Sequence, residues 1–231
     1  MLSVVIPAYN EAKRLPDTIK KIKEYLSEKN ILAELIVVDD GSTDNTLAMI
    51  PKDVKVICNV VNQGKGYSVR QGVLAAKGET ILFTDADLST PIAEIEKLLP
   101  VLASGYDIAI GSRAMKDSDV RVHQPFLRES MGKVFNLLVR LIALGGIADT
   151  QCGFKVFKQE AARKIFPRQK LKGFGFDVEV LFLGRKFGYK IKEVPVVWLD
   201  SPKSRVQVWK DPLLMFWDII RLRCLHLFAT R

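Results

Sequence analysis

Residues 80–87 read TILFTDAD, in which a short apolar run suited to a buried β-strand ends in two aspartates separated by one residue. The same arrangement occurs twice earlier, where residues 2–11 read LSVVIPAYNE and residues 34–43 read ELIVVDDGST. In each case polar residues follow the apolar run directly. Because ligands of parallel α/β sheets bind beyond the carboxyl ends of the strands, these three junctions are where we expect a functional site.

Short strand-like runs alternate with helical periodicity throughout the first half of the chain. This alternation predicts an α/β fold, with a Rossmann-like, mostly parallel sheet that carries helices on both faces. The expected strands are Leu2–Ile6, Glu34–Asp39, Val54–Cys58, Thr80–Thr84 and Asp107–Ile110, and the expected helices are Leu15–Leu26, Thr43–Ile50, Tyr67–Ala76 and Ile92–Leu102.

The pattern changes after Arg113. Residues 114–126 are expected to form a mobile loop, and two amphipathic helices are expected at Leu127–Leu144 and from Leu213 to Phe228. The apolar stripe of the last helix is predicted to include Trp217, Ile220 and Cys224, with Asp218, Arg221, Arg223 and His226 away from it. Between these helices we expect strands at Gly153–Phe157 and Ile191–Trp198 and a helix at Phe176–Phe187.

Composition favours a compact protein in a reducing compartment. The chain has 231 residues, of which 48% are hydrophobic, so it can bury a full core. Its three cysteines are far apart in the sequence, which indicates neither a disulfide framework nor a zinc site. We expect no signal peptide and no membrane span, because the start lacks a basic region and no segment offers about 20 uninterrupted apolar residues.

The positive charge is concentrated in two segments. The formal net charge is +9; residues 110–140 hold six Lys/Arg against three Asp/Glu, and residues 201–231 hold six against two. Basic patches of this kind suit phosphate groups or an anionic membrane surface. Nucleic acid is not expected as a partner, because no helix-turn-helix, zinc-finger or RNA-binding motif accompanies the charge.

Asp85 and Asp87 are the first candidate for chemistry. Two carboxylates at a strand end suit a hard divalent cation that also takes oxygens from a diphosphate, and such an ion would neutralise the charge on a departing nucleoside diphosphate. Two aspartates at a turn are also ordinary turn residues. The aspartate pair therefore indicates a metal site only in combination with other motifs.

Two further clusters allow both structural and functional interpretations. In the segment Asp39–Asp40–Gly41–Ser42, glycine suits a turn and Ser42 or Thr43 can cap a following helix, while Asp39 can bind a base or ribose. The segment 62–66, NQGKG, can hold phosphate with main-chain N–H groups and Lys65. It is not a P-loop, and the chain has no GxGxxG fingerprint, which weakens ATPase and dehydrogenase interpretations.

Taken together, these motifs resemble those of a known family. Residues 5–11 (VIPAYNE), 37–42 (VVDDGS), 62–66 (NQGKG) and 85–88 (DADL) follow the order and spacing of the inverting family 2 glycosyltransferases, which have a GT-A fold. The likeness continues through residues 111–113 (GSR), 149–155 (DTQCGFK) and 203–205 (KSR), which are similar to the polyprenyl-phosphate branch and most similar to dolichyl-phosphate glucosyltransferases.

The resemblance implies a role for each matching position. Mg²⁺ or Mn²⁺ would bind to Asp85 and Asp87, and Arg113 and Arg128 would clamp the acceptor phosphate, for which a guanidinium fork is suited. These four residues form the implied catalytic set. The implied nucleotide-sugar site consists of Pro7, Tyr9, Asn10, Glu11, Asp39, Asp40, Gly41, Ser42, Gly64, Lys65, Asp85, Ala86, Asp87, Lys203 and Arg205, and the implied acceptor-phosphate site consists of Arg113, Arg128, Gln151 and Cys152.

The acceptor chemistry follows from protonation. A phosphate monoester is mostly a dianion at neutral pH, so it needs no protein base, whereas a hydroxyl acceptor does. Asp149, Asp177 and Glu179 are conceivable bases, but a loop, cap or helix-surface role is the simpler interpretation of each. We expect transfer of a hexose, with UDP-glucose as the first donor and GDP-mannose as the alternative, to a polyprenyl phosphate with inversion. A soluble transferase acting on a sugar or protein hydroxyl is the other alternative.

The resemblance also suggests how the chain is organised. Residues 1–112 would form the nucleotide-sugar-binding half, residues 113–200 the acceptor-binding half with the helix at 127–144, and residues 201–231 a basic loop and amphipathic helix. The protein is expected to be cytoplasmic and peripheral on the cytoplasmic face of a membrane. One departure is Ser89, since mannosyl-transferring relatives commonly have glutamine there, and Ser89–Thr90–Pro91 instead favours the glucosyl-type branch.

Overall fold

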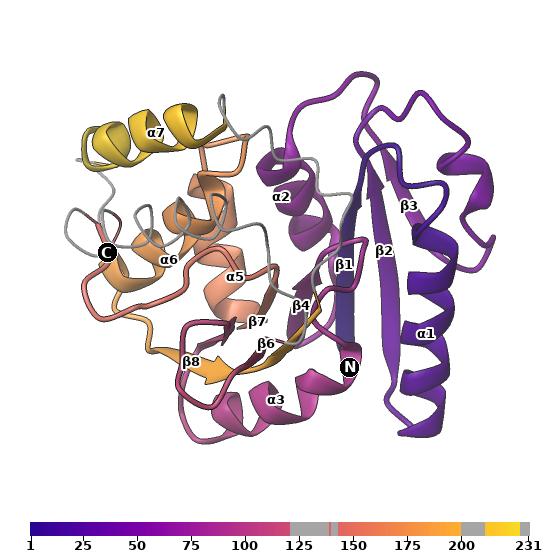
Figure 1. The fold of residues 1–231 in the computed structure, drawn as a ribbon, viewed down its shortest axis with the longest axis horizontal. Coiled ribbons are helices and arrows are strands. Elements are labelled where there is room, and N and C mark those ends of the chain that lie inside the picture. The colour runs from indigo at the N-terminus through magenta and orange to yellow at the C-terminus, as the bar shows by residue number, and fades with distance from the viewer. Residues whose placement is uncertain (121–138, 140–142, 200–210, 227–231) are drawn as a thin grey trace.

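A computed structural model describes residues 1–120, 139, 143–199 and 211–226 of the chain. Its centre is a seven-stranded sheet in the order β3-β2-β1-β4-β7-β5-β8 (Figure 1). The strands are β1 (Leu2–Ala8), β2 (Ala33–Asp39), β3 (Lys55–Cys58), β4 (Thr80–Thr84), β5 (Ile108–Ser112), β7 (Phe154–Lys158) and β8 (Ile191–Pro195). The α/β fold and the strands expected from the sequence are therefore confirmed, with ends that differ by at most two residues except at the expected strand Ile191–Trp198.

One strand runs against the others. β7 pairs antiparallel with both β4 and β5, while every other neighbouring pair in the sheet is parallel. Thr84, the last residue of β4, lies opposite Phe154, the first residue of β7. As a result, the segment that leads into β7 is placed at the carboxyl edge of the parallel strands. Residues from the second half of the chain thus meet Asp85 and Asp87.

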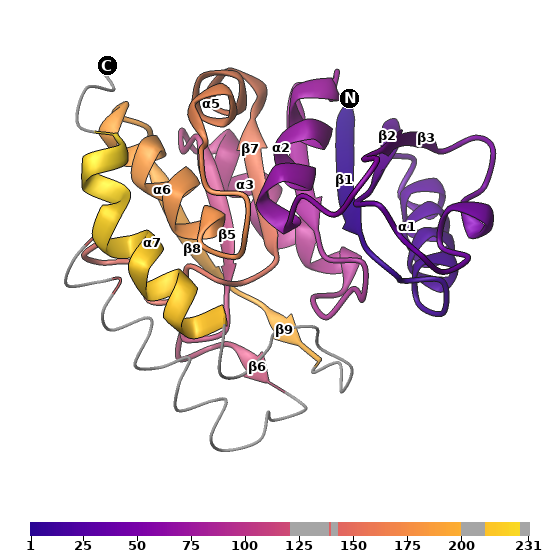
Figure 2. The same cartoon turned by 90° about the horizontal axis from the view of Figure 1, so that it is seen from above.

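Helices cover both faces of the sheet (Figure 2). One face packs on α1 (Leu15–Glu28) and α3 (Ile95–Ala103), through apolar side chains that include Ile19 and Leu98. The other face packs on α2 (Lys65–Ala75), α5 (Gln159–Ile165) and α6 (Phe176–Lys186), and α7 (Asp211–Leu225) joins that same core through Ile219 and Leu222. The alternation of buried residues on β1 explains the two layers: Val4 and Ile6 face one core and Val5 faces the other.

Residues 43–50 do not form the expected helix. Only a single 3-10 turn, η1 (Leu47–Met49), is present there. The Asn10 side-chain oxygen accepts the N–H groups of Thr43 (2.7 Å) and Asp44 (3.2 Å), so this segment is tied to the end of β1. Ser42 and Thr43 consequently cap no helix.

Smaller differences concern short elements. The expected helix at Ile92–Leu102 begins with a 3-10 turn, η2 (Ile92–Glu94), and α5 was missed because its seven residues are too few for a clear period. Within the expected loop at 114–126, β6 (Asp119–Val120) pairs with β9 (Val197–Trp198), so the expected strand Ile191–Trp198 is divided between two sheets. A further 3-10 turn, η3 (Phe166–Arg168), follows α5.

The last helix is present, and the residues of its predicted apolar stripe are exposed together. Its buried side chains are Ile219 and Leu222, followed by His226 just after the helix. Trp217 is 63% exposed, and Ile220 and Cys224 are also exposed. The helix therefore packs on the core through Ile219 and Leu222 and leaves the predicted apolar stripe on its exposed side. The expected helix 127–144 lies almost entirely outside the described residues, and within the described part no helix is long and apolar enough to cross a membrane.

Candidate active site

The site lies where β1, β2 and β4 end and the segment before β7 approaches them. The Asp85 N–H donates to the Gly153 carbonyl (3.2 Å), and an ideal Cβ placed on Gly153 would lie 1.9 Å from Asp85 Oδ2. Only glycine allows the two segments to approach this closely. Gly153 is therefore in direct contact with the first of the two aspartates.

A tight turn presents the aspartate pair. The Leu88 N–H donates to the Asp85 carbonyl (3.1 Å), and Leu88 takes a positive φ of 49°. Ser89 donates to Asp87 Oδ1 from both its N–H (3.1 Å) and its hydroxyl (2.9 Å). Ser89, the position where some relatives carry glutamine, thus orients Asp87. The Asp85 and Asp87 side chains are 32% and 19% exposed, which leaves both accessible.

Two cations already approach these carboxylates. Lys65 Nζ lies 2.6 Å from Asp85 Oδ1, and Arg14 Nη1 lies 3.7 Å from Asp87 Oδ2. Burial and the neighbouring Asp85 charge raise the pKa of Asp87 above its ordinary value, despite the hydrogen bonds from Ser89. Burial tends to lower the pKa of Lys65, but Asp85 and Asp177 outweigh it and raise that pKa. Burial and Asp85 thus disfavour the charged form of Asp87 more than Ser89 and Arg14 stabilise it.

The donor set suits a divalent cation completed by a ligand. Asp85 and Asp87 offer hard carboxylate oxygens, the type that Mg²⁺ and Mn²⁺ prefer. Among the described residues no group of three or more His, Cys, Asp or Glu is placed to hold a metal, so the remaining oxygens would come from a diphosphate and water. Lys65 would move from Asp85 toward that diphosphate.

The end of β2 is organised around two adjacent acids. Asp39 accepts from the Ser42 N–H (3.2 Å) and hydroxyl. Asp40 accepts from the N–H groups of Gln63 (2.9 Å) and Gly64 (2.8 Å) and so holds the glycine-rich segment at the start of α2. Gly41 makes the expected turn with φ 70°, where a Cβ would lie 2.7 Å from the Val61 carbonyl carbon. Asp40 thus shapes the loop with its own oxygens.

The end of β1 provides the third side of the site. Pro7 lies in β1, and Tyr9 and Asn10 follow it; Asn10 takes a positive φ of 53° and its N–H donates to the Ser42 hydroxyl (2.8 Å). Glu11 is 7% exposed and binds the Arg14 guanidinium through both carboxylate oxygens, at 2.5 and 2.7 Å. Arg14, which therefore joins Glu11 to Asp87, was missed from the sequence; its spacing of three residues after Glu11 was the available signal.

Arg113 follows β5 and is held by a buried acid. Its Nε and Nη2 donate to the two oxygens of Asp149, at 2.7 and 2.9 Å, and its guanidinium carbon lies 5.3 Å from the centre of the Trp198 ring. Burial alone would raise the pKa of Asp149, but the charge and hydrogen bonds of Arg113 lower it to about 2. Burial would lower the pKa of Arg113, and Asp149 reverses this and raises it. Asp149 is therefore a fixed anion that orients Arg113.

Gln151 and Cys152 lie between Asp149 and Gly153. The Gln151 side-chain nitrogen is buried and has no hydrogen-bond partner among the described residues. Such a donor is stabilised when a ligand supplies an acceptor. Cys152 is fully buried, its sulfur lies 3.7 Å from the Thr90 hydroxyl, and burial together with Asp149 raises its pKa to about 11. Cys152 has the surroundings of a packed thiol.

The other two conceivable bases are also engaged. Asp177 is buried against the Lys155 ammonium, which donates to it and to the Cys152 carbonyl (2.6 Å). Glu179 accepts from the N–H groups of Lys170 and Leu171, both at 2.8 Å, and lies 2.5 Å from His226 Nε2. The sequence suggested a loop, cap or helix-surface role for these two acids. Both are instead core residues, because α6 is buried on most sides. Arg128, Lys203 and Arg205 lie outside the described residues.

A mostly parallel α/β sheet with an aspartate pair after β4, a glycine-rich loop before α2 and an arginine after β5 is the arrangement expected of a transferase that acts on a nucleotide diphosphate substrate. The comparison with known families agrees: residues 3–166 match the family described as Glycosyl transferase family 2. The chain belongs to glycosyl transferase family 2.

Several curated relatives within this family share one name. The dolichyl-phosphate beta-glucosyltransferase of Dictyostelium discoideum is 34% identical, over 99% of this chain and 75% of that protein. The enzymes of the same name from Drosophila melanogaster and Homo sapiens are 37% and 36% identical, over 96% and 98% of this chain and 74% and 76% of those proteins.

The solved structures show the same fold. Glucosyl-3-phosphoglycerate synthase from Mycobacterium tuberculosis, crystallised with Mn²⁺, UDP and phosphoglyceric acid, superposes with a TM-score of 0.74 at 20% identity, covering 96% of this chain and 76% of that one. The GT-A-type architecture that the sequence motifs imply is confirmed by this match and by the seven-stranded sheet.

Proposed function

We propose that this protein transfers glucose from UDP-glucose to a polyprenyl phosphate with inversion, forming a β-linked lipid-phosphate sugar. The names of the relatives at 34–37% identity support the reaction class and the lipid acceptor. The observation that carries the proposal is the state of the acids near the acceptor side. Asp149, Asp177 and Glu179 are all committed to protein partners, so none is available as a general base.

A phosphate acceptor fits a site of this kind. Its second pKa is near 6, so it is already nucleophilic at neutral pH and needs no proton removed. Arg113, held in place by Asp149 and Trp198, would orient the acceptor phosphate through Nη1, which donates no hydrogen bond to a described residue. The free Gln151 amide would donate to a phosphate or sugar oxygen beside it. Arg128 would complete the clamp.

The donor side would hold the leaving group. Asp39 and the β1 end, with Pro7, Tyr9 and Glu11, would contact the base and ribose, while Asp85 and Asp87 would hold Mg²⁺ or Mn²⁺ on the diphosphate. When bound, the metal supplies positive charge that stabilises the departing nucleoside diphosphate. Lys65, released from Asp85, would bind a diphosphate oxygen, and Lys203 and Arg205 would close over it. In-line attack by the acceptor phosphate on the anomeric carbon breaks its bond to UDP.

The surface of α7 supports association with a membrane. Leu214, Trp217 and Ile220 are spaced one helical turn apart and are 52%, 63% and 43% exposed. Arg221 and Arg223 are exposed on the same helix. An apolar stripe flanked by arginines suits the headgroup region of an anionic leaflet. We propose that α7 lies on the membrane surface from which the lipid acceptor is drawn.

The function is tested by offering matched acceptors and donors. Purified protein with Mg²⁺ is incubated with radiolabelled UDP-glucose or GDP-mannose and either a polyprenyl phosphate or the corresponding polyprenol. We expect organic-extractable label only with UDP-glucose and the phosphate. Transfer to polyprenol or to a soluble sugar hydroxyl would reject the base-free mechanism, and product from GDP-mannose alone would reject the assignment of the donor.

A further inference from the structure

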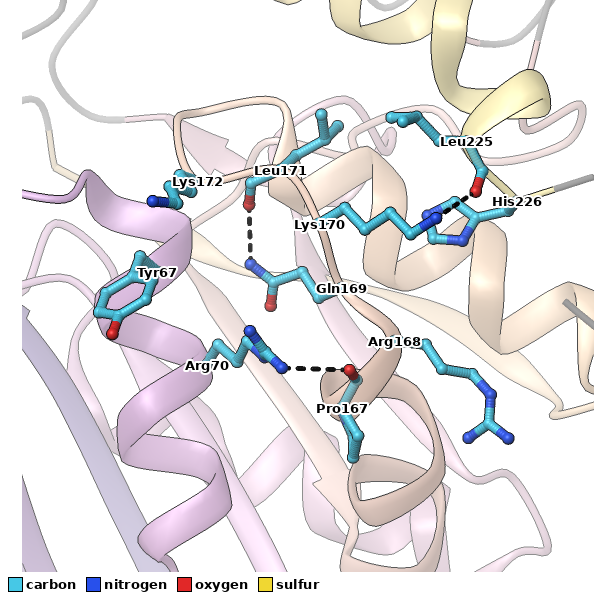
Figure 3. A pocket seen from close by; sticks show the side chains of 10 residues that line it. All are labelled: Tyr67, Arg70, Pro167, Arg168, Gln169, Lys170, Leu171, Lys172, Leu225 and His226. Atoms are coloured by element: carbon cyan, nitrogen blue, oxygen red, sulfur yellow. Dashed lines mark hydrogen bonds between the residues drawn. The ribbon is translucent and has the colours of Figure 1, made fainter.

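A second polar cavity lies between α2 and the segment 167–172 (Figure 3). Its volume is about 670 Å³, within the range of small-molecule sites. It is lined by Tyr67, Arg70, residues 167–172 and, at the end of α7, Leu225 and His226. Neither the aspartate pair nor Arg113 belongs to this lining. The cavity adjoins the candidate active site only through the glycine-rich segment, to which Lys172 and Gln169 donate hydrogen bonds at Gln63 and Gly66.

The lining is strongly basic. It contains Arg70, Arg168, Lys170 and Lys172, and none of the described residues that line it is an aspartate or glutamate. Within the described part of the chain, none of these four cations forms an ion pair with a carboxylate. A concave surface with several uncompensated positive charges concentrates anions.

The hydrogen bonds of these cations go to neutral oxygens. Arg70 donates to the carbonyls of Phe166 (3.0 Å) and Pro167 (3.1 Å), and Lys170 donates to the Leu225 carbonyl (2.7 Å). Lys172 donates to the Gln63 side-chain oxygen (3.0 Å). These bonds hold the side chains in place without neutralising them. The cavity therefore presents preorganised donors to an anion, which is the arrangement that binds phosphate.

A buried amide adds a second requirement. Gln169 is 4% exposed, and its side-chain nitrogen donates to the carbonyls of Gly66 (2.8 Å) and Leu171 (2.9 Å). Its oxygen is buried and accepts no hydrogen bond from the described residues, and Figure 3 shows it on the side that faces Arg70. An unsatisfied buried acceptor is rare in folded proteins and calls for a donor from a ligand or water.

We propose that this cavity, called the groove below, binds a phosphate ester that carries a hydroxyl group. The phosphate would lie beside the side chains of Arg70 and Lys170, and the hydroxyl would donate to the Gln169 oxygen. Arg168 takes no part, because its guanidinium donates to the Lys164 carbonyl (3.1 Å) and lies over the Phe187 ring. A soluble sugar or polyol phosphate and the headgroup of an anionic lipid share this chemistry. The proposal does not depend on the transferase function, since no residue of the candidate active site takes part.

Calorimetric titration tests the proposal with defined probes. The protein is first saturated with UDP and Mg²⁺, so that the donor site is filled, and then titrated with glycerol 3-phosphate or with methyl phosphate, which at pH 8 has no O–H group to donate. Vesicles of phosphatidylcholine with and without phosphatidylglycerol form the lipid arm. The Arg70→Gln/Lys170→Gln variant removes two groove charges, and Lys20→Gln/Lys21→Gln, on exposed α1 positions, is the charge-matched control.

We expect glycerol 3-phosphate to bind more tightly than methyl phosphate, and the groove variant to lose about tenfold or more in affinity while the control loses none. Circular dichroism checks that both variants are folded. Groove-dependent binding only to phosphatidylglycerol vesicles would support the site and assign it to a lipid headgroup. Equal affinity in the groove variant and the control, or no binding of any probe, would overturn the proposal.

Discussion

The acids on the donor side of the candidate site differ from the acid on its acceptor side in both exposure and pKa. On the donor side, Asp85 and Asp87 are partly exposed, and the pKa of Asp87 is raised because burial and Asp85 disfavour its charge. On the acceptor side, Asp149 is buried and accepts hydrogen bonds from Nε and Nη2 of Arg113, and its pKa is lowered to about 2. In the proposed mechanism the donor acids would bind a metal ion, whereas Asp149 holds the guanidinium of Arg113.

The largest effect is expected from removing a donor-side charge. Asp87→Asn should lower the rate of glucosyl transfer by about 100- to 1000-fold, because a charge that holds the leaving-group cation is lost. The measurement is kcat with UDP-glucose, together with Mn²⁺ binding by calorimetry in the presence of UDP. Asp17→Asn, an exposed acid on α1, is the control and should leave both unchanged. Normal Mn²⁺ binding by the Asp87 variant would contradict the metal assignment.

A structural acid should affect stability and leave chemistry intact. Asp177→Asn leaves the Lys155 ammonium buried without its carboxylate, and we expect the free energy of unfolding to fall by about 3 kcal/mol. Because Asp177 is not a base in this account, kcat of the folded variant should stay within a fewfold of the wild-type value. Urea unfolding gives the first quantity and single-temperature kinetics the second. Wild-type stability with abolished kcat would identify Asp177 as the base of a hydroxyl transferase.

Asp149→Asn should alter both stability and acceptor use. Arg113 would lose the carboxylate that fixes its orientation, so we expect about 3 kcal/mol of destabilisation and a raised KM for the lipid phosphate, with KM for UDP-glucose little changed. Kinetics with each substrate varied in turn would reveal the split. If KM for the donor rose instead, Asp149 and Arg113 would belong to the donor side.

The same pair predicts an acid-dependent loss of stability. The pKa of Asp149 is lower in the folded protein, about 2, than its ordinary value of 3.8, so its contribution is present above about pH 4 and disappears as pH falls toward 2. The contribution should be about 2 kcal/mol. Unfolding free energies of wild type and Asp149→Asn, measured from pH 5 downward, should therefore converge. If the difference between the two unfolding free energies stayed constant as pH falls, the lowered pKa of Asp149 would be contradicted.

The smallest effect concerns the membrane. Trp217→Gln removes the most exposed aromatic side chain of the α7 stripe, and we expect roughly tenfold weaker binding to vesicles that contain anionic lipid. Sedimentation with vesicles measures this. Val60→Gln, an apolar residue that is 98% exposed far from α7 in sequence, is the matched control. Equal losses in both variants would remove the special role of α7.

Much of the donor side could be predicted from the sequence. Apolar runs followed by acids placed Asp39, Asp85 and Asp87 at strand ends, because a buried strand has a strong local signature and parallel strands end at one edge. The mostly parallel sheet followed from the same alternation. The helix expected at residues 43–50 is absent. The Asn10 side-chain oxygen accepts the N–H groups of Thr43 and Asp44 and ties this segment to the end of β1.

The acceptor side was less accessible to prediction. The antiparallel insertion of β7 between β4 and β5 is a long-range choice, and it alone brings Gly153 against Asp85. The partner of Arg113 is 36 residues away in sequence, so no local pattern reveals that Asp149 is consumed in a salt bridge. Which face of α7 is buried could not be predicted for the same reason, since it depends on the core that Ile219 and Leu222 join.

The central claim is that a lipid phosphate, with no protein base, attacks the anomeric carbon directly. The most direct measurement is the anomeric configuration of the product, determined by NMR after transfer from UDP-[1-¹³C]glucose to a polyprenyl phosphate. The account predicts a β-glucosyl phosphate bond, because one in-line displacement inverts the α-linked donor. An α-linked product would contradict single in-line attack and require a different mechanism.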